Sequence, residues 1–162
     1  MNSGKFITEM ISLPQNILSM ISYLHSGWAL FTVLLVFFTV IRHLRGFLLK
    51  KPYGLHSDFR LALLALVVFV IQIILGLLNF FTSDYFAGIR EGHTGEYMKN
   101  AHTRLIILEH PTMAIVGLLF MLYGFRRMYY HVDPRRKYWA IALFYASALL
   151  AVASRLPWKD WI

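Results

Sequence analysis

Four long blocks of apolar residues, 17–41, 61–81, 105–125 and 138–156, alternate along the chain with short charged segments. A transmembrane helix needs about 20 mostly apolar residues to cross ~30 Å of hydrocarbon, and each block has roughly that length. The blocks lack the strict alternation of a membrane β-barrel, and open sheet edges leave backbone groups unpaired in lipid. The pattern therefore predicts an all-α integral membrane protein, a four-helix bundle that forms one domain over residues 1–162.

Basic residues are divided unevenly between the connections. Ten of the 16 Lys and Arg residues lie in segments 42–60 and 126–137, and the other six lie near the two termini and in the connection between the second and third blocks. Loops rich in Lys and Arg stay on the cytoplasmic side of a membrane, so both termini are expected on the outer, periplasmic side. The net charge of +8 then reflects topology and suits anionic lipid headgroups, and no nucleic-acid partner is expected.

The N-terminal segment is expected to remain in the mature protein. The first apolar block is too long for a signal peptide, and the basic residues follow it instead of preceding it. Residues 6–13, which end at Pro14, are predicted to form a short interfacial helical turn.

Composition restricts the available chemistry. The chain has no cysteine, which excludes disulfides, thiolate metal sites, iron-sulfur clusters and cysteine nucleophiles, and leaves histidine as the residue for metal chemistry. No glycine-rich phosphate loop, nucleophile elbow or pair of carboxylates is present, so hydrolase and nucleotide chemistry are not expected.

His25 and His110 are the candidate metal ligands. His25 lies eight residues into the first block and His110 five residues into the third, and both blocks run inward from the outer side. At ~1.5 Å rise per residue, both imidazoles are expected roughly 10 Å inside the outer surface. An ionisable residue inside a membrane indicates a functional site, and one histidine from each of two helices is a common way to hold heme iron. The expected cofactor is heme b.

Two further residues suit a heme at this depth. Arg104 directly precedes the third block, where its guanidinium can bind a heme propionate. Gly117 lies seven residues after His110, on nearly the same helical face, where it leaves room for the macrocycle. The alternative is that each histidine donates to a backbone carbonyl across the bundle and that Gly117 serves only close helix packing. Both interpretations remain open.

The other polar residues of the blocks have simpler expected roles. Helical rise places His43 at the cytoplasmic interface, where a solvated ring is expected instead of a second heme. Glu109 is expected either to form an interfacial ion pair with Arg104 or to relay a proton at a quinol site. Asn79, Gln72 and Thr39 are expected to make interhelical hydrogen bonds of about 0.6 kcal/mol each.

Three parts of the chain resemble a known family. They are LHSGW at 24–28, MKNAHTR with LEHPTMA within 98–114, and IALFYASALLAVASRLPW at 141–158. These segments are similar to those of small four-helix bacterial inner-membrane proteins that are labelled cytochrome b-like. The resemblance implies that His25 and His110 are the heme ligands and that Arg104 is the basic residue above the third helix. Family members often have a further histidine at the position of Val70, and its absence puts the ligand set in question.

The expected function is therefore that of a small b-type cytochrome in the bacterial inner membrane. It would carry single electrons in a respiratory or quinol-linked chain and perform no catalysis of its own. Its expected partners are membrane lipids and either the quinol pool or a larger membrane protein complex. The alternative is a cofactor-free accessory or structural subunit of such a complex. A heme requires the rings of His25 and His110 to face one porphyrin-sized gap, whereas a structural role lets them point apart.

Overall fold

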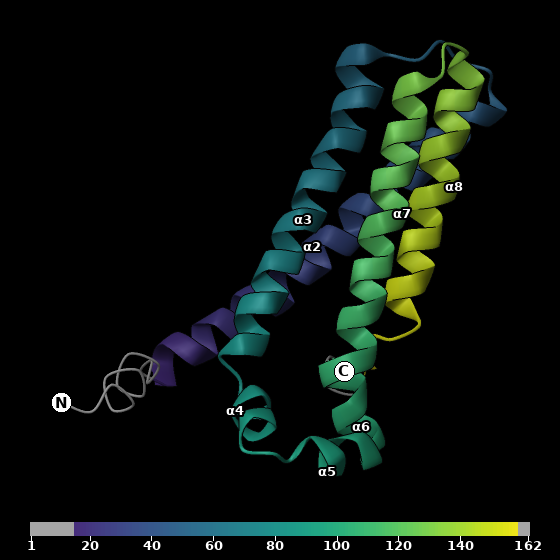
Figure 1. Ribbon diagram of the computed structural model, residues 1–162. Helices are drawn as coiled ribbons and strands as arrows, with labels where there is room; N and C mark the ends of the chain where they lie inside the picture. Colours follow the sequence, from purple (N-terminus) through teal and green to yellow (C-terminus); the bar gives the residue numbers. More distant parts are fainter. Residues whose placement is uncertain (1–14, 159–162) are drawn as a thin grey trace.

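The structure, a computed structural model, describes residues 15–158 and is helical throughout its regular elements. The helical turn expected at 6–13 lies outside the described residues. Residues 15–158 form four long helices, with three short helices between the second and third (Figure 1). The long helices are α2 (Gln15–Leu48), α3 (Arg60–Phe81), α7 (His110–Tyr130) and α8 (Pro134–Ala153), and the short ones are α4 (Asp84–Arg90), α5 (Thr94–Lys99) and α6 (Ala101–Arg104). Two π-helical segments, η1 (Leu55–Phe59) and η2 (Leu105–Glu109), lead directly into α3 and α7.

Three helical stretches of the described chain are long and apolar enough to cross a membrane. They are Asn16–Leu48, Leu55–Phe81 and Ala101–Tyr130, which contain the first three predicted blocks. The prediction of an all-α chain is confirmed. The fourth block corresponds to α8, which is not among the three stretches because its first turn carries Arg135, Arg136 and Lys137. α8 also ends at Ala153, three residues before the end of the predicted block at 156.

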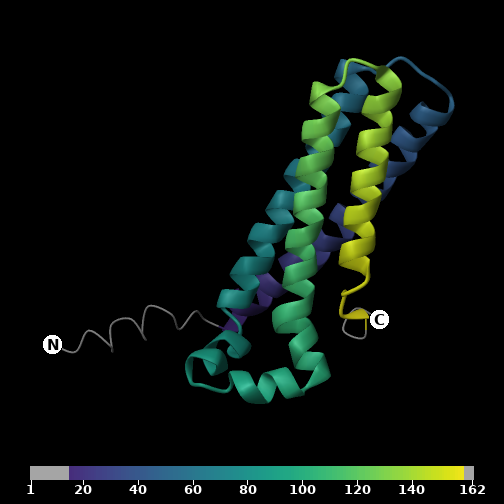
Figure 2. The same ribbon diagram turned by 45° about the vertical axis from the view of Figure 1, so that its right-hand side comes forward.

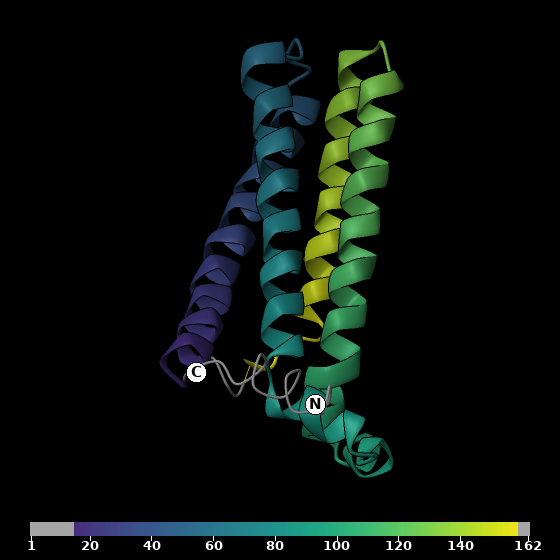
Figure 3. The same ribbon diagram turned by 60° about the vertical axis from the view of Figure 1, so that its left-hand side comes forward.

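The four long helices pack in a closed order. α2 contacts α3 and α8, and α7 contacts α8 and α3. Viewed from one side, α2 and α3 lie together and α7 and α8 lie beside them (Figure 3). α2 crosses the other helices at an angle, so that its first turns point away from α7 and α8 (Figures 1 and 2). Tyr23, in this part of α2, is accordingly 77% exposed.

The two ends of the helices differ in charge. The α2–α3 and α7–α8 connections lie at one end, and the short helices, the start of α2 and the end of α8 lie at the other (Figure 1). We call these the basic end and the terminal end. Segments 42–60 and 126–137, with ten Lys and Arg residues, lie at the basic end. The two sequence segments that are rich in Lys and Arg thus lie together at one end of the molecule.

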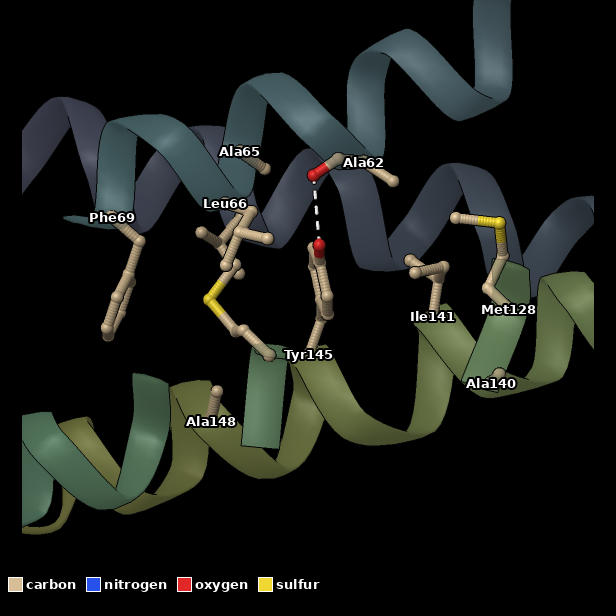
Figure 4. Packing of buried hydrophobic residues seen from close by; sticks show 11 residues of the cluster. Ala62, Ala65, Leu66, Phe69, Met128, Ala140, Ile141, Tyr145 and Ala148 are labelled. Atoms are coloured by element: carbon tan, nitrogen blue, oxygen red, sulfur yellow. Dashed lines mark hydrogen bonds between the residues drawn. The ribbon is translucent and has the colours of Figure 1, made fainter. Parts of the chain in front are cut away.

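The apolar core lies along one face of α8, where small and large residues interdigitate. Tyr145 is fully buried, and its hydroxyl donates a 2.9 Å hydrogen bond to the carbonyl of Ala62 on α3 (Figure 4). Gly124 brings α7 close to α8, because a Cβ atom there would lie 3.2 Å from the carbonyl oxygen of Ala140 and collide with Phe144. Close contact at small residues is the usual way in which membrane helices associate.

Candidate functional site

His110 lies at an irregular point of a long helical stretch. Residues Leu105–Glu109 form a π-helical turn directly before it, and Pro111 directly follows it. Proline lacks an N–H group, and its ring collides with the carbonyl four residues earlier in a regular α-helix. A π-turn relieves such crowding by widening the backbone, and π-turns are frequent at functional sites. Pro111 thus accounts for the π-helical turn that directly precedes His110.

One ring nitrogen of His110 is held by the protein. Its Nδ1 lies 3.1 Å from the carbonyl oxygen of Arg155, just after α8. A carbonyl oxygen can only accept, so Nδ1 carries the proton and Nε2 has a free lone pair. Among the described residues, Nε2 has no hydrogen-bond partner. An imidazole anchored through Nδ1–H to a carbonyl is the usual arrangement of a metal-binding histidine.

His25 is also anchored through Nδ1, by Gln72 of α3. The Nε2 atom of Gln72 lies 3.1 Å from Nδ1 of His25 and 3.3 Å from the His25 carbonyl oxygen. The predicted interhelical hydrogen bond of Gln72 is therefore confirmed. Gly76, one turn further along α3, leaves space for the ring, because a Cβ atom there would lie 3.0 Å from Cε1 of His25.

The orientation of the Gln72 amide decides what His25 can bind. When Gln72 donates to Nδ1, the proton of a neutral imidazole resides on Nε2, which then cannot bind a metal. If the Gln72 amide is turned over, its oxygen accepts a hydrogen bond from Nδ1–H of His25, and the Nε2 atom of His25 keeps a lone pair that can bind a metal. The orientation of an amide is assigned from its hydrogen-bond network. In the present orientation Oε1 of Gln72 is buried without a hydrogen-bond partner. An unpaired buried carbonyl costs about 1–3 kcal/mol. The turned orientation carries a similar cost, because it would bring the amide oxygen to 3.3 Å from the His25 carbonyl oxygen and leave the amide nitrogen buried without a partner.

The two histidines lie at the same end of the bundle. Both side chains are partly buried. They come from α2 and α7, which lie diagonally across the closed order of helices. The two rings make their hydrogen bonds with different neighbours: His25 contacts Gln72 of α3, and His110 contacts the Arg155 carbonyl after α8.

Arg104 is engaged by an acidic partner. Its Nε lies 2.9 Å from Oε1 of Glu109, and its Nη1 donates to the carbonyl of Met98 at 3.0 Å. The predicted ion pair between Arg104 and Glu109 is confirmed. Arg155 is a further cation that sequence reasoning missed, with its Nε 3.5 Å from Oε2 of Glu109. A propionate at this end would compete with Glu109 for two arginines.

Gly117 packs against other side chains. A Cβ atom there would lie 3.1 Å from Cγ2 of Val152, 3.3 Å from Cζ of Phe69 and 3.4 Å from the carbonyl oxygen of Ala148. The contacts of Gly117 are therefore those of close helix packing, the second of the two roles considered for it. For Gly117 to border a macrocycle, Phe69 or Val152 must take another side-chain rotamer.

A second group of polar residues is buried at the basic end, and sequence reasoning did not single it out. We call it the Asp58 cluster; its members are Arg42, His43, Tyr53, Asp58 and Tyr138. Asp58 is 4% exposed and accepts hydrogen bonds from Arg42 Nε at 2.8 Å, the Gly54 amide at 2.9 Å and the Tyr138 hydroxyl at 2.7 Å. These bonds join α2, the start of α3 and the start of α8.

The prediction that His43 has a solvated ring is wrong. The residue is fully buried, with its ring centroid 6.0 Å from that of Tyr53 and 5.7 Å from that of Tyr138. Its Nδ1 lies 2.8 Å from the Thr39 carbonyl, and its Nε2 is buried with no hydrogen-bond partner in the described chain. The α2–α3 connection and the start of α8 cover this ring. The sequence of α2 alone therefore does not predict that His43 is buried. The interhelical bond predicted for Thr39 is also wrong, because its hydroxyl donates to Leu35 within α2.

Tyr53 completes the Asp58 cluster. Burial raises the pKa of its hydroxyl well above the ordinary value, and the nearby Asp58 carboxylate adds to the shift. The hydroxyl therefore stays protonated, and it is buried without a hydrogen-bond partner in the described chain. The cluster contributes mainly to stability, since it links three long helices through one carboxylate. Within residues 15–158, no set of three or more His, Asp or Glu side chains is arranged to hold a metal ion.

Comparison with protein-family models, characterised proteins and solved structures finds no match to this chain. The resemblance to cytochrome b-like proteins therefore depends on the three sequence segments alone.

Proposed function

We propose that this chain is a small b-type cytochrome of the bacterial inner membrane, with heme b held by His25 and His110. The observation that carries the proposal is shared by both residues. Each imidazole is anchored through Nδ1 by a group of a neighbouring helix or its end, and each Nε2 is left without a hydrogen-bond partner in the described chain. Anchored Nδ1 and an available Nε2 are what an axial ligand needs. His110 meets both conditions, and His25 meets them when the Gln72 amide is turned so that its oxygen accepts from Nδ1–H.

The proposal places all four long helices across the membrane, with both termini on the periplasmic side. Three membrane-length helices and the concentration of Lys and Arg at one end support this placement. Large apolar side chains are exposed along the outer faces of the helices, for example Leu34 at 58%, Leu64 at 51% and Leu119 at 59%. Lipid tails are the surroundings in which such faces are stable.

Each residue around the proposed heme has its own role. Heme supplies the one-electron chemistry, while the protein sets orientation and potential. His25 and His110 bind the iron, and Gln72 and the Arg155 carbonyl fix the two rings. Arg104 would meet a propionate in competition with Glu109. The quinol pool or a larger membrane complex would deliver and accept the electrons.

A second candidate is a cofactor-free accessory or structural subunit of a larger inner-membrane complex. Two observations favour it. The space beside Gly117 is filled by Phe69 and Val152, and Gln72 presents its amide nitrogen to His25. The exposed apolar faces that suit lipid suit the helices of a partner subunit equally well.

A reduced-minus-oxidised absorbance spectrum of the purified protein separates the two candidates. The heme proposal predicts a b-type α-band that is lost in His25→Ala and in His110→Ala. His56→Ala is the matched control, because His56 is exposed at the basic end and should keep the band. A colourless wild-type preparation with intact helical circular dichroism would favour the subunit instead. A band that survives both substitutions would reject these ligands.

A further inference from the structure

Two pockets at the basic end share part of their lining. Each has a volume of about 300 Å³, and Arg136 and Trp139 line both. One pocket extends to Phe47 of α2 and to Arg135, and the other runs between α7 and α8 past Arg127 to Leu143 and Phe144. We call this surface the basic groove.

The positive charge in the basic groove is poorly neutralised. The contacts of Arg127 are with neutral groups, His131 Nε2 and the Tyr123 hydroxyl, each at 3.4 Å. Arg136 has a carboxylate partner, Asp133, at 3.8 Å.

Arg135 adds a third cation to the groove. Its guanidinium lies 4.8 Å from the centre of the Phe47 ring. The Asp133 carboxylate also accepts from the Arg135 amide at 2.9 Å and so caps α8. Of these three guanidinium groups, only that of Arg136 is paired with a carboxylate in the described chain, which leaves the groove suited to an anion.

The groove changes from charged to apolar along its length. Trp139 packs against Phe47 with ring centroids 5.0 Å apart, and tryptophan is typical of the headgroup level of a membrane. Beyond Trp139 the wall consists of Ala140, Leu143 and Phe144 on α8. A free phosphate would use only the charged part, whereas a ligand with a hydrocarbon tail would use both.

We propose that the basic groove binds the headgroup of an anionic phospholipid of the cytoplasmic leaflet. The phosphate lies between Arg127 and Arg136, and an acyl chain follows Leu143 and Phe144. Basic pockets between helices on the cytoplasmic side are suited to such headgroups, and a guanidinium can donate two parallel bonds to a phosphate. The inference rests on the membrane insertion proposed above and does not require heme.

Native mass spectrometry of the full chain in detergent tests this inference. Phosphatidylglycerol and phosphatidylcholine with identical acyl chains are titrated against the wild type. We expect retention of phosphatidylglycerol, and apparent affinity for it about tenfold weaker in the double variant Arg127→Gln/Arg136→Gln. The matched control is Lys51→Gln/Arg60→Gln, which removes two charges from the same end outside the groove and should bind like the wild type.

Three outcomes would overturn the inference. They are equal retention of the two lipids, an equal loss in both double variants, and displacement of phosphatidylglycerol by inorganic phosphate at similar concentration. If the groove double variant does not fold, the single variant Arg136→Gln, at an exposed position, should still weaken binding about threefold, and unchanged binding would reject the site. The assay does not depend on color or heme content. Failure of membrane insertion would appear separately, as protein released from membranes by alkaline carbonate.

Discussion

The hydroxyl of Tyr138 donates a 2.7 Å hydrogen bond to Oδ2 of Asp58, across 80 positions of sequence. The same carboxylate pairs with Arg42 of α2 through Oδ1 at 2.8 Å. Asp58 precedes α3, and Tyr138 lies in the first turns of α8. Three of the four long helices therefore meet at one buried carboxylate, which fixes the basic end of the molecule.

Asp58→Asn should lower stability markedly. Asparagine has the same size but no charge, and its amide group faces donors that need an acceptor. Breaking a buried charged network costs about 3 kcal/mol, which corresponds to roughly 6–12 °C in Tm for a chain of this size. Thermal unfolding in detergent measures the shift. Asp84→Asn, at an exposed position in the first turn of α4, should cost less than about 1 kcal/mol. Equal shifts for the two variants would contradict the role of Asp58.

His43→Leu should be nearly neutral, although the residue is fully buried. Leucine has a similar volume, and the substitution removes both the bond to Thr39 and the unpaired Nε2 atom. Replacing a partly satisfied polar group by an apolar one of similar shape is expected to change stability by less than about 1 kcal/mol. His43→Ala should instead cost about 2–4 kcal/mol through the cavity it leaves. A large loss in His43→Leu during the same thermal assay would show that Nε2 has an essential partner.

Gly76→Ala should reduce heme content without removing a ligand. The new methyl group would lie 3.0 Å from Cε1 of His25 and force the ring to shift. Heme bound per chain after purification is the measurement, and we expect less than half of the wild-type value, since small displacements of ligands have large effects. Gly27→Ala is the control, because no atom lies within 4 Å of a Cβ atom at that position of α2. Equal heme content in the two variants would place the iron away from His25.

Gln72→Leu should weaken heme binding about 10- to 100-fold, as expected for loss of a group that orients a metal ligand. Heme transfer to an acceptor protein gives the relative affinity. Asn79→Leu, in which another polar residue of α3 is replaced, serves as the control. Unchanged transfer in Gln72→Leu would indicate that the contact with His25 serves only helix packing.

Sequence reasoning was most successful for features that repeat within one helix. Long apolar blocks identify α2, α3 and α7, because hydrophobicity over 20 residues does not depend on tertiary contacts. The ion pair between Arg104 and Glu109 was also predictable, since the two residues are five positions apart. Gln72 was recognised as a polar residue that needs a partner, but its choice of His25 depends on the register of α2 against α3.

Contacts between segments that are far apart in the sequence could not be predicted from the pattern of apolar and polar residues. His43 looks like an interfacial residue of α2, and only Tyr53 and Tyr138 make it a buried one. Asp58 lies in a charged connection, where a solvated carboxylate is the ordinary expectation. The Arg155 carbonyl that holds His110 is a backbone group and leaves no trace in residue types.

The central claim is that two imidazoles bind one iron at the terminal end. Electron paramagnetic resonance of the oxidised, purified protein tests it most directly, because two axial histidines give a low-spin ferric heme. The account predicts this low-spin signal in the wild type, and its loss or conversion to high spin in both His25→Ala and His110→Ala. A folded wild-type protein without any heme signal, or a low-spin signal that persists in either variant, would contradict it.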